Sequence, residues 1–130
     1  MNAGGRDMTG SADRPRDPDC VFCRIVANEL PSTRVAEDEV AIAFRDIAPQ
    51  APTHILVVPR VHIPSAAHLT DADSALSGHL LAMCAEIARA EGISQGGYRI
   101  STAVGKWAGQ TVDHLHFHVM GGRPSRSTAA

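Results

Sequence analysis

The sequence predicts an α+β domain, with a mostly antiparallel sheet of about five strands and two helices. Short apolar runs of strand length are separated by turn residues, and two separate segments repeat their apolar residues at helical spacing. We expect one domain at residues 20–123. Residues 1–19 are polar and lack hydrophobic periodicity, so we expect a disordered N-terminal tail there, and we expect a short C-terminal tail at residues 124–130.

Composition narrows the class of protein. The 130 residues are 44% hydrophobic and 20% charged, with a formal net charge of −2, which is the profile of one globular domain. Broad binding to nucleic acid needs clustered positive charge and is not expected. No apolar run approaches the roughly 20 residues that span a bilayer, so no membrane partner is expected. The polar first twenty residues lack the apolar stretch of a secretory signal, and we expect a cytoplasmic location.

Two segments are predicted to be helical. In the first, which is short, Asp19 is the expected N-cap and Pro31 marks the end. Its apolar face consists of Val21, Phe22, Ile25 and Val26. In the second, the longest of the chain, Thr70 is the expected N-cap, Asp73 completes a weak capping box and Gly92 is the C-terminal stop. Its apolar positions are Leu76, Leu80, Met83, Cys84 and Ile87.

Strands are predicted between and after these helices. They are expected at residues 33–37, 40–45, 54–59, 97–104 and 114–120. Pro49 and Pro52 predict a rigid loop before the third strand, and residues 105–109 predict a glycine-bearing loop before the last one.

The last predicted strand is the most informative segment because it alternates histidine with apolar residues. Alternate side chains of a strand share a face, so His114, His116 and His118 are predicted to lie on one face. The opposite face, directed into the core, consists of Leu115, Phe117 and Val119. A solvated polar face is the simplest interpretation, but the perfect alternation between glycine-rich flanks argues against it. A metal site stays open for His114.

Nucleophilic catalysis is the interpretation that we favour. A neutral imidazole, with an ordinary pKa of about 6.5, attacks phosphorus near neutral pH without a base to ionise it first. A second histidine on the same face can donate a proton to the leaving group.

These residues resemble the histidine triad (HIT) family, specifically its Hint-like branch of nucleotide-binding hydrolases. The family motif is His-φ-His-φ-His-φ-φ, where φ is apolar, and residues 114–120 fit it at every position. Residues 44–54 (FRDIAPQAPTH) resemble the family's nucleoside-binding segment, and residues 109–112 (GQTV) resemble its phosphate-side loop. The resemblance covers about residues 20–123. It implies the HIT-like fold and a homodimer, with residues 97–104 and the long helix at the interface.

The resemblance implies a role for each catalytic position. His116 would be the nucleophile and form a transient nucleotidyl-histidine. His118 would contact the phosphate and help to protonate the leaving group, and His54 would join that proton network. Thr111 would belong to the same catalytic set.

The resemblance also implies the contacts of the substrate. Gly109, Gln110 and Thr111 would hold phosphate or leaving-group oxygens, together with His116 and His118. Asp46 would accept hydrogen bonds from the ribose hydroxyls. The implied base pocket consists of Val21, Phe22, Ile25, Phe44 and Ile47. For any one of these apolar residues alone, a place in the core is the simpler interpretation.

Cys20-x-x-Cys23 has the spacing of a zinc ligand pair, which is half of a tetrahedral site. The resemblance implies His62 and His114 as the other two ligands of a structural Zn²⁺ ion, and it leaves His116 and His118 free. The alternatives are a reduced cysteine pair beside unrelated histidines and, less well supported, a redox pair. The chemistry itself would require no cofactor.

The sequence departs from the family pattern in three places. Ala103 stands where the family usually has an asparagine, although Ser101 is predicted to face the same side of the strand. Trp107, the chain's single tryptophan, lies in the loop before the triad. After Arg123 the chain continues with Pro-Ser-Arg-Ser instead of the Hint-type tail. We therefore expect a different substrate preference or weak activity.

The leading hypothesis is a nucleoside phosphoramidase-like hydrolase. It would cleave a purine nucleoside 5′-monophosphate from a small, amine-type leaving group through a nucleotidyl-histidine, with a purine nucleotide or nucleoside phosphoramidate as its ligand. A dinucleoside polyphosphate hydrolase is the alternative within enzymes. The transferase branch, which has glutamine at the third histidine, is disfavoured by His118. A catalytically weak nucleotide-binding or scaffold dimer is the alternative of another class, and Ala103 keeps it open.

Overall fold

A five-stranded antiparallel sheet forms the centre of the molecule in the computed structural model, which describes residues 16–125. The strand order is β2-β3-β4-β6-β5, and every neighbouring pair is antiparallel. The strands are β2 (Arg34–Glu37), β3 (Ala41–Arg45), β4 (Thr53–Pro59), β5 (Tyr98–Ser101) and β6 (Phe117–Gly121). This confirms the α+β class and the antiparallel sheet expected from the sequence.

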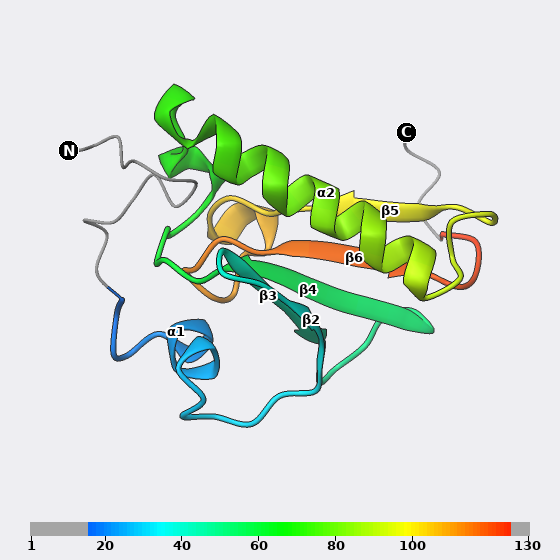
Figure 1. Ribbon diagram of the computed structural model, residues 1–130, viewed down its shortest axis with the longest axis horizontal. Coiled ribbons are helices and arrows are strands. Elements are labelled where there is room, and N and C mark those ends of the chain that lie inside the picture. The colour runs from blue at the N-terminus through cyan, green and yellow to red at the C-terminus, as the bar shows by residue number, and fades with distance from the viewer. Residues whose placement is uncertain (1–15, 126–130) are drawn as a thin grey trace.

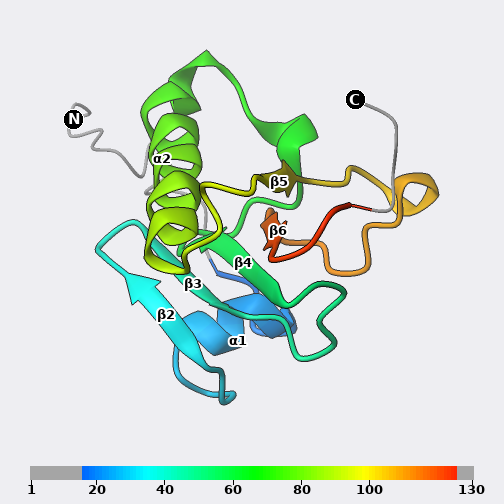
Figure 2. The same ribbon diagram turned by 90° about the vertical axis from the view of Figure 1, so that its right-hand side faces the viewer.

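Two helices cover opposite faces of this sheet (Figures 1 and 2). The long helix α2 (Ser74–Ala90) packs on one face, and the short helix α1 (Val21–Val26) packs on the other. The central strand β4 is buried at all seven positions because both of its faces are covered. Its continuous apolar run is the sequence signature of that double burial.

The two tails fall mostly outside this description. Residues 1–15 and 126–130, assigned to the tails in the sequence analysis, lie outside the described residues. Just before α1, Asp17 forms a turn: its side chain accepts the Asp19 N–H and its main-chain oxygen accepts the Cys20 N–H. No helix between residues 16 and 125 is long and apolar enough to cross a membrane.

The helix caps differ in part from the prediction. The N-cap of α1 is Cys20 and not Asp19, because Cys20 has extended backbone angles and its Sγ accepts the Cys23 N–H at 3.3 Å. The capping box of Thr70 and Asp73 is confirmed, although it opens a short 3₁₀ turn (Asp71–Asp73) that leads into α2. Gly92 follows α2 with a φ of 75°, in the left-handed region that favours glycine.

Two strands are shorter than predicted, and the reason matters for function. Strand β5 ends at Ser101 and not at Val104, and β6 begins at Phe117 and not at His114. Before Phe117 the chain leaves the ladder with β4, since the Leu115 N–H donates to the Ile63 carbonyl at 2.6 Å. The predicted apolar face is confirmed: Leu115, Phe117 and Val119 are buried in the cluster that contacts α2.

Gly122 lies in the turn that follows β6, and its conformation and close contact favour glycine. Its φ is 100°, and a Cβ placed there would lie 2.8 Å from Pro52 Cβ in the loop before β4. We expect Gly122→Ala to lower the free energy of unfolding by about 1–3 kcal/mol, measured by far-UV circular dichroism in urea. Gly96→Ala is the matched control, because no atom lies within 4 Å of its added Cβ and its φ is not positive. Equal stability of the two variants would contradict this account of the turn.

Candidate active site and metal centre

A main-chain oxygen determines which ring nitrogen of His116 carries the proton. His116 is only 5% exposed, and its Nδ1 lies 2.7 Å from the His114 carbonyl oxygen. A carbonyl only accepts, so Nδ1 carries the proton and donates it. Nε2 of the neutral ring therefore keeps a lone pair. Phe22 of α1 packs edge-on against this ring, with 5.1 Å between the ring centroids.

His54 and His118 form a hydrogen-bonded pair whose protons are placed in the same way. The Gln50 N–H donates to His54 Nδ1 at 3.0 Å, so the proton of a neutral His54 is on Nε2. His54 Nε2 lies 2.9 Å from His118 Nδ1 and donates to it. His118 then carries its own proton on Nε2. Its ring centroid is 5.0 Å from that of His116.

Burial keeps this pair uncharged. Burial, with smaller contributions from His116 and His54, lowers the pKa of His118 to about 4, while Asp46 acts in the opposite direction. The pKa of His54 is also lowered by burial, against the carboxylate of Asp46, whose Oδ2 lies 3.4 Å from His54 Nε2. Both rings are therefore neutral at pH 7, as the hydrogen bonds require.

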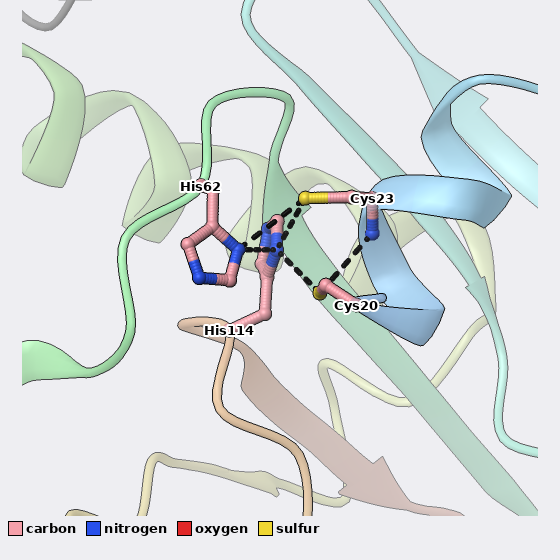
Figure 3. A group of neighbouring side chains, drawn as sticks. All are labelled: Cys20, Cys23, His62 and His114. Carbon is pink, nitrogen blue, oxygen red and sulfur yellow. Dashed lines mark hydrogen bonds between the residues drawn. The ribbon is translucent and has the colours of Figure 1, made fainter. Parts of the chain in front are cut away.

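A second set of side chains surrounds the imidazole ring of His114 (Figure 3). Cys20 and Cys23 come from the start of α1, His62 from the segment after β4, and His114 from the segment before β6. His114 Nδ1 lies 3.3 Å from Cys20 Sγ and 3.6 Å from Cys23 Sγ, and His62 Nδ1 lies 3.3 Å from both Cys23 Sγ and His114 Nδ1. All four ligand atoms lie within 4.8 Å of one another.

These residues fit a tetrahedral metal ion. Zn–N bonds near 2.0 Å and Zn–S bonds near 2.3 Å place the ligand atoms roughly 3.3–3.8 Å apart, which matches the separations above. His114 Nε2 donates to the Pro59 carbonyl at 2.9 Å, so the lone pair of Nδ1 faces the two sulfur atoms. The set could hold a metal ion without using His116 or His118.

Comparison with known proteins agrees with this geometry. Residues 27–125 match the family model described as the HIT domain. The purine nucleoside phosphoramidase of Escherichia coli (strain K12) is 41% identical over 104 residues, which cover 80% of this chain and 87% of that protein. The chain belongs to the HIT family. It is a hydrolase of the HIT type.

Solved structures of HIT proteins superimpose closely. A HIT family hydrolase from Clostridium thermocellum has a TM-score of 0.82 and 39% identity, covering 86% of this chain and 100% of that one. A histidine triad protein from Clostridium difficile has a TM-score of 0.84 and 38% identity, covering 88% of this chain and 99% of that one. The HIT-like fold expected from the sequence is confirmed.

A second cluster of possible ligand atoms includes the last histidine of the triad. Asp46, His54 and His118 present ligand atoms within 4.8 Å of one another. His54 Nδ1 already accepts the Gln50 N–H, so the neutral ring needs its proton on Nε2 and has no lone pair there for a metal. This cluster is better suited to moving a proton than to binding a cation.

The apolar residues expected around a base fall into two groups. Phe22, Ile25 and Phe44 are buried between α1 and the sheet, in one cluster with Leu56 and Val58. Val21 is 46% exposed and Ile47 is 99% exposed. The first group is therefore also core, whereas the second offers apolar surface to solvent.

The loop before the triad is held by Gln110. Its Oε1 accepts the Gly105 N–H, and its Nε2 donates to the carbonyl groups of Pro64 and Val112. The main-chain N–H groups of Gly109 and Gln110 donate to Lys106 and Gly105 within the same loop.

These bonds involve two of the three loop residues that are expected to contact phosphate. Of the three residues expected to contact phosphate, only the exposed Thr111 makes no hydrogen bond within residues 16–125. The side chain of Gln110 holds the loop, and the expected contacts of Gly109 and Gln110 with phosphate stay predictions. Trp107, in a 3₁₀ turn of this loop, is 97% exposed.

The strand before this loop places a hydroxyl beside the triad. Ser101 of β5 pairs with His118 of β6, so it lies on the same face as His118, as its alternation predicts. Ala103 lies beyond the end of β5 and is half-buried.

Four groups that matter for the site escaped the sequence analysis. The Thr102 hydroxyl donates to the His116 carbonyl at 2.7 Å. The other three are the main-chain groups of Gln50, Pro59 and His114 that place the histidine protons. A hydroxyl next to Ser101 could have been noticed, but a main-chain group has no signal in residue type.

The pKa of His118 predicts how stability depends on pH. The unfolded value is about 6.5, so the unfolded chain binds more protons than the folded one down to about pH 4. His118 therefore lowers the free energy of unfolding as the pH falls from 6.5 towards 4, and it has no such effect above about pH 7. Urea unfolding of the wild type and of His118→Gln, followed by circular dichroism from pH 4 to 8, measures this effect.

The difference between the two curves isolates His118 from the other acid-sensitive groups. The groups that face it are His116, two residues before it in the chain, His54 from β4 and Asp46 from the loop after β3. We expect the variant to lose less stability on acidification than the wild type. Parallel curves for the two proteins would show that His118 does not gain a proton on unfolding.

Proposed function

We propose that this HIT hydrolase releases a purine nucleoside 5′-monophosphate from a small, amine-type leaving group through a nucleotidyl-histidine intermediate on His116. One observation carries the proposal: hydrogen bonds leave the lone pair of His116 on Nε2 and the N–H of a neutral His118 on its Nε2, and the centroids of the two rings are 5.0 Å apart. The E. coli relative named purine nucleoside phosphoramidase supports the substrate class.

In the first step, the lone pair of His116 Nε2 attacks phosphorus and the P–N bond breaks. The leaving amine takes a proton from Nε2 of His118. The His54–His118 pair takes up a proton from solvent in exchange, so it stays neutral, and the nucleotidyl-His116 ring carries a positive charge. In the second step, water attacks phosphorus and the bond to Nε2 of His116 breaks, so that His116 is neutral again. The water gives up its proton through His118 to solvent, and both histidines are regenerated over one turnover.

The remaining positions provide binding. Asp46 would accept hydrogen bonds from the ribose hydroxyls, and Val21 and Ile47 would contact the base, which would cover apolar surface that is now exposed. The free N–H and hydroxyl of Thr111 would contact phosphate oxygens. The complete histidine pair favours an enzyme over the catalytically weak scaffold, in spite of Ala103.

We also propose that Cys20, Cys23, His62 and His114 hold a structural Zn²⁺ ion and that two copies form a homodimer. The zinc proposal is supported by four separations of 3.3–3.6 Å between the ligand atoms, which suit a tetrahedral ion. The dimer proposal is supported by β5, which lies at the edge of the sheet and pairs with β6 on one side only among the described strands. The cytoplasmic location and the domain limits stay predictions from the sequence.

Adenosine 5′-phosphoramidate tests the catalytic proposal. We expect AMP release by the wild type and its loss in His116→Ala, because the covalent route has no other nucleophile. His118→Gln is expected to slow release by about 10²- to 10⁴-fold, the range for losing a general acid. His79→Ala, a change on α2 outside the site, is the control and should match the wild type. A wild type that binds AMP but releases none from the substrate would refute the phosphoramidase function.

Metal analysis tests the zinc proposal. We expect about one zinc ion per chain after gel filtration, measured by mass spectrometry of the elements, and its loss in Cys23→Ser, since a hydroxyl replaces a thiolate ligand. Cys84→Ala is the matched control, because Cys84 is buried in the core under α2, apart from the four ligands. Purified wild type without stoichiometric zinc would remove the proposal.

A further inference from the structure

His114 belongs to the metal centre and to the catalytic site at the same time, through different atoms. Its ring nitrogen Nδ1 faces Cys20, Cys23 and His62. Its main-chain oxygen accepts the Nδ1–H of His116 at 2.7 Å. The residue is fully buried, and its other ring nitrogen is bound to the Pro59 carbonyl. A displacement of this ring would therefore move the group that fixes the proton of His116.

The carbonyl of His114 is available for this contact because the chain is not yet in the sheet. The ladder between β4 and β6 begins at the pair Val57 and Phe117. Within a ladder, most main-chain oxygens accept from a neighbouring strand. The path of the chain at residues 114–116 is held by two other bonds, from Leu115 N–H to the Ile63 carbonyl and from the Thr102 hydroxyl to the His116 carbonyl. The first of these adjoins His62, another residue of the metal centre.

A second contact joins the two centres through α1. Cys20 and Cys23 tie the start of this six-residue helix to His62 and His114. Phe22 lies between the two cysteines and packs edge-on against His114 and His116, with centroid separations of 5.9 Å and 5.1 Å. The metal centre is thus connected to His116 by two contacts: the main-chain oxygen of His114 and the ring of Phe22.

We propose that the metal acts as a positioning element for the nucleophile: by holding the His114 ring and helix α1, it keeps His116 in the tautomer whose Nε2 is unprotonated. This inference rests on the proposed metal centre and the proposed nucleophile. Without the metal, the His114 ring and Phe22 lose one of the contacts that hold them, and the proton of His116 exchanges between Nδ1 and Nε2. The metal then controls the rate of the first chemical step without touching the substrate.

The variant His62→Ala separates this role from the others. His62 is the one proposed ligand that belongs neither to α1 and its cap nor to the triad. Replacing it therefore leaves the side chains of Cys20 and His114 present. Nitrogen-15 NMR of the histidine rings reports the tautomer of each, and elemental analysis reports the metal. We expect wild-type protein with zinc to show His116 protonated on Nδ1 only. We expect His62→Ala to lose the metal and to show exchange between both tautomers of His116.

His54 is an internal reference in the same spectra. Its tautomer is set by the Gln50 N–H, at a distance from the metal centre, and should not change. The single-turnover rate of forming nucleotidyl-His116 should fall by roughly tenfold or more, the cost typical of losing a group that orients a ligand or catalyst. His68→Ala, at an exposed histidine six residues further along the chain, is the matched control and should keep metal, tautomer and rate.

His62→Cys keeps a metal ligand at the same position and tests the result if His62→Ala unfolds. With zinc bound and a single His116 tautomer restored, it supports the proposal. A metal-free protein in which His116 stays protonated on Nδ1 alone would overturn it, as would a metal-bound His62→Cys in which His116 exchanges. Failure to form nucleotidyl-His116 from any phosphoramidate would refute the proposed function, whereas the tautomer comparison would still decide this inference.

Discussion

A neutral imidazole has one proton and two nitrogens, and the rest of the site depends on which nitrogen holds that proton. In this protein the main chain decides it for three histidines. The His114 carbonyl, the Gln50 N–H and the Pro59 carbonyl set the tautomers of His116, His54 and His114. These groups leave one lone pair on Nε2 of His116, direct one N–H towards His118 and direct one lone pair towards the cysteines. The same three-residue segment can then serve both the proposed reaction and the proposed metal centre.

The sheet makes these placements rigid. Strand β4 carries His54 at its start and the Pro59 carbonyl at its end, and it is buried on both faces between α1 and α2. Burial has a second effect, because the low polarity that keeps His118 neutral also raises the cost of leaving any of these polar groups without a partner. The hydrogen bonds and the burial therefore support one another.

Much of this arrangement could be predicted from the sequence. The alternation at residues 114–120 correctly separated the core side chains from the histidines, and the apolar run of β4 indicated a strand covered on both sides. The strand boundary at Phe117 could not be predicted, because His114 and Leu115 have an ideal strand pattern and leave the ladder through a main-chain bond to Ile63. Gln110 shows the same limit: its residue type gives no sign that its side-chain groups bind the main chain of its own loop and of Pro64. Side-chain type is readable in a sequence, and the direction of main-chain groups is not.

The exposure of Trp107 has a practical consequence for spectroscopy. It is the only tryptophan of the chain, and 97% of its surface already faces solvent in the folded protein. Unfolding therefore hardly changes the surroundings of this indole, and its emission will barely register the loss of the core. A change in that fluorescence would instead report an event at the loop itself, such as a ligand or a second chain that covers the indole while the fold stays intact.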